Sequence, residues 1–314
     1  MNQKKYSNKL NYFIKNSFVE FNSLLDKKEC RRLYNKIKNS REWGPKLFQS
    51  ENKYKLEFKK KPKIKLNPGK GIQNLVDEHN LEFIEKNKSI IDLLKIILGE
   101  NYKIILSKFV VAVPNNWMPN YVKQRNKKKL ISNFNEYIKK EFRDVTYFRG
   151  IDYHMDSIDW EKKNNRFITM YIYLNDIDET MSPLNVIKKS HIFGHTSFPH
   201  YLKKDKSHSN IEYSPDGKNY TKFKSHKLLG KTGALYIWTS NTLHGTSPSF
   251  DDKENFRISL RYLIKKNSKS KGMLDKLVNQ KIVGKTRIKN FYIKEFWNKN
   301  FNSKLKPTLH ILSN

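Results

Sequence analysis

Two histidines and one aspartate, His154, Asp156 and His244, have the residue types of a metal site. His154 and Asp156 are two positions apart, so in an extended segment both side chains project from the same face. If His244 joined them, the site would offer two neutral nitrogens and one carboxylate, a donor set that suits iron(II). Three coordination positions would then stay open for a co-substrate and dioxygen.

The His-x-Asp pair taken alone is weak evidence, because a chain with nine histidines contains such a pair readily by chance. Downstream of His244, Arg257 begins a segment that reads as a strand. The guanidinium group of an arginine can donate two parallel hydrogen bonds to the two oxygens of a free carboxylate. Arg261 lies four positions further, on the same face of that strand, so either arginine could bind such a carboxylate. Taken singly, a loop histidine at 244 and a surface charge at 257 are the simpler interpretations.

The elements that must position these residues are mostly strands in the second half of the chain. Runs rich in β-branched and aromatic residues predict strands over 103–113, 167–174, 234–238 and 257–264. Helices are expected from Asp26 to about Ile37 and from Ser89 to Leu98, with Gly99 as the C-terminal cap. Helices first and many short strands later predict a mainly β, α+β protein, a sandwich or barrel with a helical N-terminal layer.

Residues 51–70 form a lysine-rich run that ends in Asn-Pro-Gly, and they predict an exposed loop or an edge strand. We expect a single domain over 1–264, with its helical layer at about 15–100 and its strand core at about 101–264. A polar, basic insertion containing a short helix is expected at 115–145. Residues 265–314 are then a basic C-terminal extension, in which 291–297 form a candidate docking helix.

The order of these motifs resembles the phytanoyl-CoA dioxygenase-like family of Fe(II)/2-oxoglutarate-dependent oxygenases. The likeness covers roughly residues 15–264. It includes an acidic turn at 175–180 and a short apolar strand leading to a Ser-His turn at 182–191. It also includes a Gly-containing strand start at 230–234 and a His-Gly-Thr segment at 244–246. Lys188-Lys189 replace the family's Pro-Gly before the Ser-His turn, and about two extra residues separate His244 from Arg257.

The resemblance implies a double-stranded β-helix (jelly-roll, cupin-like) core. It also assigns six residues: His154, Asp156 and His244 to iron(II), and Arg257, Thr246 and Tyr171 to 2-oxoglutarate. The implied reaction consumes O2, hydroxylates a C–H bond of a small molecule and releases succinate and CO2. Related halogenases lack the carboxylate that Asp156 supplies, so its presence favours hydroxylation.

Composition sets the remaining expectations. Hydrophobic residues make up 37% of the 314-residue chain, which is enough to build a core, and one cysteine excludes an internal disulfide framework. No stretch is long and apolar enough to be a membrane span, and we expect a cytoplasmic protein. Nothing in the sequence indicates the oligomeric state.

The net charge of +33 allows several interpretations. It suits an anionic partner, and an anionic small-molecule substrate is our hypothesis. A nucleic-acid-modifying oxygenase is the alternative enzyme, since such a charge binds polyanions regardless of sequence. AT-rich coding, which favours lysine, explains much of the charge without any partner. From another class of function, the chain could be a catalytically silent jelly-roll binding module.

Overall fold

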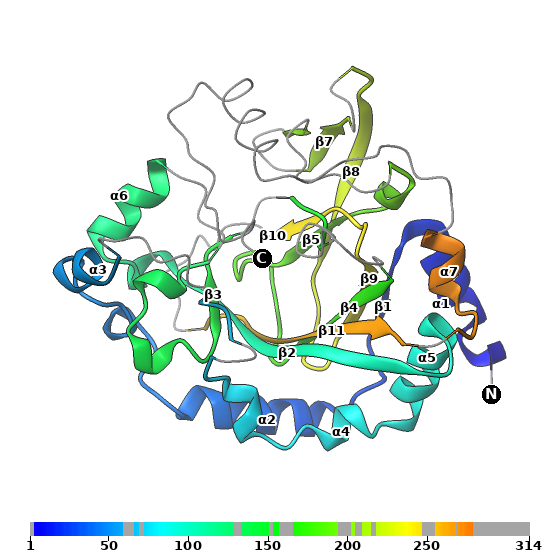
Figure 1. The fold of residues 1–314 in the computed structure, drawn as a ribbon, viewed down its shortest axis with the longest axis horizontal. Helices are drawn as coiled ribbons and strands as arrows, with labels where there is room; N and C mark the ends of the chain where they lie inside the picture. Colours follow the sequence, from blue (N-terminus) through cyan, green and yellow to red (C-terminus); the bar gives the residue numbers. More distant parts are fainter. Residues whose placement is uncertain are drawn as a thin grey trace.

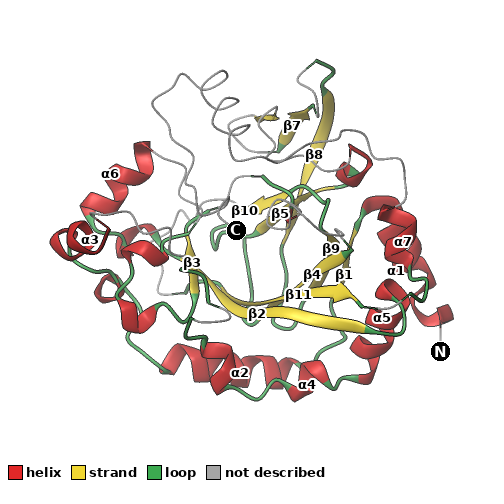
Figure 2. Ribbon diagram, in the orientation of Figure 1, coloured by secondary structure: helices red, strands yellow, loops and turns green. Residues whose placement is uncertain are grey.

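Two β-sheets form the centre of the molecule, and helices cover one face of the larger sheet (Figures 1 and 2). The computed structural model describes residues 3–58, 66–68, 72–128, 133–150, 153–156, 166–193, 202–204, 209–214, 218–246, 255–267 and 269–278. Mixed sheets with added helices agree with the predicted mainly β, α+β class.

The larger sheet has six strands in the order β1-β9-β4-β11-β2-β3. Their bounds are β1 Phe18–Phe21, β2 Tyr102–Ala112, β3 Thr146–Phe148, β4 Phe167–Tyr173, β9 Leu235–Thr239 and β11 Ile258–Lys266. The β2–β3 pair is parallel, and the other neighbours in the sheet are antiparallel. The four strands predicted from the sequence, β2, β4, β9 and β11, therefore all belong to this sheet.

The smaller sheet has five strands in the order β10-β5-β8-β7-β6. Their bounds are β5 Leu184–Ile187, β6 Leu202–Lys204, β7 Asn210–Tyr213, β8 Thr221–Leu228 and β10 His244–Thr246. Leu184 and Val186 of β5 pack in one hydrophobic cluster with Tyr171 and Trp238 of the larger sheet. This cluster joins the two sheets, and we call the side of the larger sheet that faces it the inner face.

Alternation along the central strands separates two environments. On β4, Ile168, Met170 and Ile172 pack into the main core with the helices, whereas Tyr171 and Tyr173 belong to the cluster between the sheets. Successive side chains of a strand point to opposite faces, so Thr169 shares the inner face with the two tyrosines. By the same alternation, β11 directs Arg257, Ser259 and Arg261 to the inner face, because Ile258 and Leu260 lie in the main core.

Seven α-helices lie in the described ranges: α1 Gln3–Asn16, α2 Lys27–Asn39, α3 Glu51–Phe58, α4 Glu82–Glu85, α5 Lys88–Leu98, α6 Asn120–Lys128 and α7 Met273–Val278. Short 3-10 helices cover Pro45–Leu47, Leu75–Glu78, Asn115–Trp117, Asn135–Tyr137, Lys140–Phe142 and Ser190–Phe193. Helices α2, α4 and α5 run along the outer face of the larger sheet (Figure 1). Within the described residues, no helix combines the length and the hydropathy that a membrane crossing requires.

The two predicted helices form, with one change of cap. Asp26 caps α2, since its carboxylate accepts a hydrogen bond from the Lys28 N–H at 2.7 Å. Helix α5 begins before Ser89, and its cap is Asn87, whose side chain accepts from the Ile90 N–H at 3.2 Å. Asparagine is as good an N-cap as serine, so the earlier residue can take that position. Gly99 ends the helix with φ +94°.

The lysine-rich run was wrongly predicted as a loop or strand in its first part, because residues 51–58 form helix α3. Its sequence has no apolar period, and Tyr54 is its buried residue. The Tyr54 ring stacks on Tyr137 with centroids 4.8 Å apart, and Glu57 accepts two hydrogen bonds from Arg143. Contacts to residues far along the chain therefore stabilise this helix. The N-terminal residues, for which the sequence predicted no element, form α1 and β1.

The predicted basic insertion at 115–145 contributes to the core rather than standing apart from it. It contains the short helix α6, as expected, but Trp117, Val122, Phe134 and Tyr137 are buried in the main core. Strand β11 continues to Lys266, past the predicted domain end at 264, and α7 follows it. Leu274 and Leu277 of α7 also lie in the main core. The candidate helix at 291–297 lies outside the described residues.

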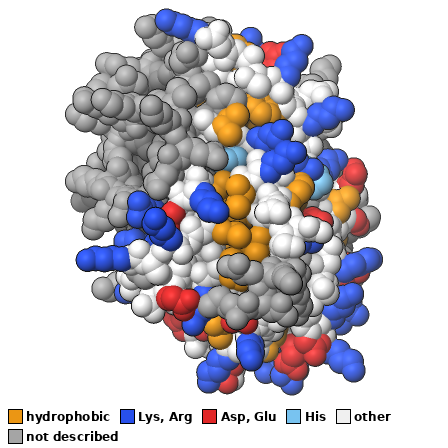
Figure 3. Space-filling model, turned by 90° about the vertical axis from the view of Figure 1, so that its right-hand side faces the viewer, with side chains coloured by type: hydrophobic (Ala, Val, Ile, Leu, Met, Phe, Trp, Pro, Cys, Tyr) orange, Lys and Arg blue, Asp and Glu red, His pale blue; other side chains and the backbone are white. Residues whose placement is uncertain are grey.

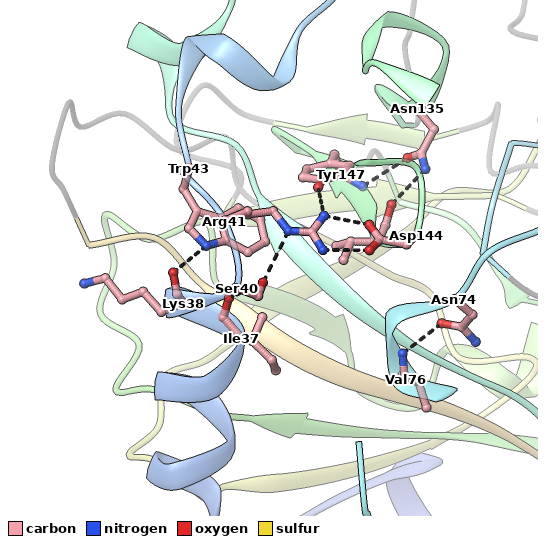
Figure 4. Close-up of polar contacts among 11 residues, drawn as sticks. Ile37, Lys38, Ser40, Arg41, Trp43, Asn74, Val76, Asn135, Asp144 and Tyr147 are labelled. Atoms are coloured by element: carbon pink, nitrogen blue, oxygen red, sulfur yellow. Dashed lines mark hydrogen bonds and ion pairs between the residues drawn. The ribbon is translucent and has the colours of Figure 1, made fainter. Parts of the chain in front are cut away.

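A buried polar network ties the end of α2 to β3 (Figure 4). Both terminal nitrogens of Arg41 bond the Asp144 carboxylate, at 2.7 and 2.6 Å. Beside this pair, the Trp43 ring lies 5.2 Å from Phe256, which directly precedes Arg257. Phe256 also meets Trp117 edge-on at 4.7 Å. The helical layer therefore packs against Phe256, which lies just before Arg257 and the start of β11.

Candidate metal centre

His154 and His244 are brought together by an isolated antiparallel β-bridge. The His154 N–H donates to the His244 carbonyl at 2.9 Å, and the His244 N–H donates to the His154 carbonyl at 3.0 Å. Asp156 Oδ1 lies 3.6 Å from His244 Nε2 and 3.9 Å from His154 Nε2. The three ligand atoms are all within 4.8 Å of one another, so the three residues predicted as metal ligands can hold one ion.

The tautomer of His244 is set by the backbone. Its Nδ1 lies 2.8 Å from the Thr242 carbonyl oxygen, which can only accept a hydrogen bond. Nδ1 therefore carries the proton, and Nε2 keeps its lone pair for a metal. The ring is buried and lies 4.9 Å from the Trp238 ring, so its orientation is also constrained by packing.

The Asp156 carboxylate is 1% exposed and is surrounded by donors. Thr169 Oγ1 and Trp238 Nε1 donate to Oδ2 at 2.6 and 3.1 Å, and Arg261 Nη2 donates to Oδ1 at 2.7 Å. Burial acts to raise the pKa of Asp156, but Arg261 and then the neighbouring histidines lower it more strongly, leaving the pKa well below its ordinary value. The group is a carboxylate at any pH at which the protein functions.

Arg257 is fully buried on the inner face, with one hydrogen bond, from Nη1 to the Tyr171 hydroxyl at 3.1 Å. Its Nε and Nη2 atoms have no hydrogen-bond partner among the described residues. A buried guanidinium with unused donors is costly unless an anion accepts them. The same guanidinium lies 5.7 Å from the centre of the Tyr171 ring. Burial raises the pKa of Tyr173, and the charge of Arg257 offsets only part of this rise. Arg257 thus has unused donors of the kind that a carboxylate accepts, next to the Tyr171 hydroxyl.

The structure separates the roles of the two arginines that the sequence left as alternatives. Arg261 contacts the Asp156 carboxylate, whereas Arg257 carries the unused donors. Thr246 ends β10, two residues after His244, opposite Leu184 of β5. Since Leu184 belongs to the cluster between the sheets, Thr246 faces the same interior. Its contact with 2-oxoglutarate stays a prediction.

The donor set fits iron(II) and leaves room for a co-substrate. A carboxylate oxygen has two lone-pair positions, and both positions of Asp156 Oδ2 are used by Thr169 and Trp238. Asp156 can therefore offer one oxygen, Oδ1, to a metal. Two imidazole nitrogens and one oxygen leave three positions open in an octahedral ion. The predicted cofactors, Fe(II), 2-oxoglutarate and O2, fit these ligands and the buried arginine.

Sequence reasoning missed the residues that hold the ligands in place. Thr169 and Trp238 lie directly opposite each other on β4 and β9, and both reach Asp156. A threonine at an alternate position of a strand that is otherwise apolar or aromatic is the signal that could have indicated such a partner. The alternation of β4 separates Thr169, Tyr171 and Tyr173 from the apolar Ile168, Met170 and Ile172, but it does not identify Asp156 as the partner of the threonine.

Comparisons with protein-family models and with curated protein sequences give no match. Among solved structures, the chain is similar to SnoN, a non-haem α-ketoglutarate-dependent epimerase from nogalamycin biosynthesis, with 9% identity, coverage of 84% of both chains and a TM-score of 0.49. It is similar to SnoK, an α-ketoglutarate-dependent carbocyclase from nogalamycin biosynthesis, with 10% identity, 82% and 83% coverage and a TM-score of 0.48. It is also similar to the non-haem monooxygenase ThoJ, with 12% identity, 82% and 76% coverage and a TM-score of 0.46.

Proposed function

We propose that this chain is an Fe(II)/2-oxoglutarate-dependent oxygenase of the phytanoyl-CoA dioxygenase-like kind, which hydroxylates a C–H bond of a small molecule and releases succinate and CO2. The two packed sheets support a jelly-roll core for it. One observation carries the proposal: three metal-ligand atoms from distant parts of the chain lie within 4.8 Å of one another, and the same interior holds a buried arginine with unused donors.

The metal would be held by His154 Nε2, His244 Nε2 and Asp156 Oδ1. When bound, iron(II) with 2-oxoglutarate supplies the oxidative decarboxylation and the activation of O2 that C–H hydroxylation needs. The protein supplies fixed ligands, since Thr242 orients the His244 ring, and Thr169 orients the Asp156 carboxylate.

The co-substrate would be oriented by its distal carboxylate. Arg257 Nε and Nη2 are two donors in one plane, and a carboxylate accepts such a pair in bidentate fashion. Tyr171 holds the guanidinium from the other side through Nη1. Because the arginine is fully buried, this ion pair would form away from water, where its strength and its directionality are greatest.

The test is anaerobic titration of the protein with Fe(II) and then with 2-oxoglutarate. The expected result is the visible charge-transfer absorption of an iron(II)–2-oxoglutarate complex, with one equivalent of each per chain. His244→Ala should abolish the band. His79→Gln is the matched control, because His79 lies on the outer helical layer, where its ring meets Phe109 edge-on, and its variant should keep the band.

A wild-type protein that folds but shows no band and no iron binding would contradict the proposal. That result would favour the silent binding module. If the band forms, the main substrate can be sought by screening metabolite pools under O2 for succinate release above the uncoupled background.

We also propose that the main substrate is a small anionic molecule. The support is charge. Lys and Arg side chains are spread over the face of the molecule drawn in Figure 3, and on the inner face Lys108 stands directly opposite Arg261 in the strand register. The screen should therefore give succinate release with anionic pools first. Salt-sensitive binding to DNA or RNA at low ionic strength would instead favour the nucleic-acid alternative.

A further inference from the structure

The Asp156 carboxylate has one donor more than its orientation requires. Thr169 and Trp238 occupy both lone-pair positions of Oδ2 and lie on adjacent strands, in register with each other. Both side chains are buried, at 0% and 1% exposure, so their positions are well constrained. These two bonds already turn Oδ1 toward the histidines.

The additional donor is Arg261, and it bonds the oxygen that would bind the metal. Arg261 Nη2 lies 2.7 Å from Asp156 Oδ1, and this same atom faces His244 Nε2 at 3.6 Å. With one lone pair of Oδ1 used by the guanidinium, the other is left for an ion. The arginine and the metal would then share a single oxygen.

A cation that shares a ligand oxygen changes what that oxygen gives to the metal. A charge-assisted hydrogen bond draws electron density from the carboxylate and is strong in a buried, low-dielectric site. The guanidinium charge of Arg261, 2.7 Å from Oδ1, therefore opposes the binding of a further cation at this oxygen.

We propose that Arg261 is a positioning residue that acts through Asp156, weakening this carboxylate as a metal donor. Bound iron(II) is consequently held less tightly and is harder to oxidise than it would be in the same His-Asp-His site without the arginine. The inference rests on the proposed function and assigns Arg261 a role separate from that of Arg257, whose unused donors serve the co-substrate.

The experiment compares the wild type with Arg261→Met and Arg261→Lys, each as the full chain and stripped of metal beforehand. Anaerobic Fe(II) and 2-oxoglutarate give the position of the charge-transfer band, in which an electron moves from iron to the co-substrate. Without the arginine, Asp156 becomes the stronger donor, so the Arg261→Met band is expected at lower energy. Co(II) affinity, measured without 2-oxoglutarate, is expected to tighten about 10-fold, because the variant lacks the positive charge that repels a cation at this oxygen. Arg261→Lys retains the cation and should return both values toward the wild type.

A purely structural role for Arg261 would leave the band where it is in the wild type, and that result would overturn the inference. Weaker Co(II) binding in Arg261→Met would overturn it as well, because it would mean that the arginine is needed to orient the carboxylate. Should the methionine variant fail to fold, Arg261→Gln removes the charge with a polar side chain, and the same shifts are required of it. Absence of the band in the wild type would overturn the proposed function itself, so the two failures are distinguishable.

Discussion

Replacing Arg257 by methionine should stabilise the protein while removing co-substrate binding. The guanidinium is fully buried, makes one hydrogen bond, and leaves Nε and Nη2 without partners among the described residues. Exchanging such an unpaired buried charge for an apolar side chain of similar volume should raise the free energy of unfolding by about 1–4 kcal/mol in the absence of 2-oxoglutarate. For a chain of this size, the melting temperature should rise by about 2–4 °C for each kcal/mol.

The loss in co-substrate binding follows from the same geometry. Truncating one partner of a buried, hydrogen-bonded charge pair costs about 2–5 kcal/mol, so the 2-oxoglutarate dissociation constant should rise by about 30- to 5,000-fold. Urea denaturation of the dialysed protein gives the stability. Anaerobic titration of the iron-loaded protein, followed by the charge-transfer band, gives the affinity.

Arg143→Met is the matched control for a buried arginine that already has its anion. Arg143 donates to Glu57 at 2.6 and 2.7 Å and to the Ile138 carbonyl at 2.9 Å. Its loss leaves Glu57 without this partner and should destabilise the protein by about 3–5 kcal/mol. If Arg257→Met lost as much stability as this control, or bound 2-oxoglutarate as the wild type does, Arg257 would not be the binding residue for the co-substrate carboxylate.

Three further predictions concern the rest of the structure. Thr169→Val removes one donor from Asp156 and should weaken Co(II) binding about 10–100-fold in a spectroscopic titration; unchanged affinity would refute its orienting role. Burial lowers the pKa of His191 from 6.5 to about 4, so the unfolded chain alone takes up this proton and stability should fall as the pH drops from 6.5 to 4. In urea melts across that range, His191→Gln should show a shallower loss than the wild type, and an identical slope would contradict the assignment. Asn87→Ala should cost about 1 kcal/mol of stability, whereas Ser89→Ala should cost almost nothing, because Asn87 is the cap.

The proximity of His154, Asp156 and His244 could be predicted only from the motifs taken together. Taken singly, the His-x-Asp pair, the distant histidine and the arginine at a strand start each have a simpler interpretation. Their supporting residues were not predictable. Thr169 and Trp238 sit in strands that are buried on both faces, so alternation could not indicate which side contacts Asp156.

The helices and strands could be predicted from the sequence wherever one pattern dominated, as in α5 and β2. The prediction failed where an element is stabilised by residues far away in the sequence. Helix α3 depends on Tyr137 and Arg143, which lie far downstream, and its own lysines and glutamates carry no period. The core residues of the basic insertion could not be predicted for a related reason, because its abundant lysines obscure single apolar residues such as Trp117 and Phe134.

The proposed site is tested most directly by a crystal structure of the protein soaked anaerobically with Fe(II) and 2-oxoglutarate, with anomalous differences collected at the iron edge. We expect one iron peak in contact with His154 Nε2, His244 Nε2 and Asp156 Oδ1, with the distal carboxylate of 2-oxoglutarate on Arg257 Nε and Nη2. An iron peak elsewhere, or a co-substrate whose distal carboxylate lies on Arg261 while Arg257 stays unpaired, would contradict it.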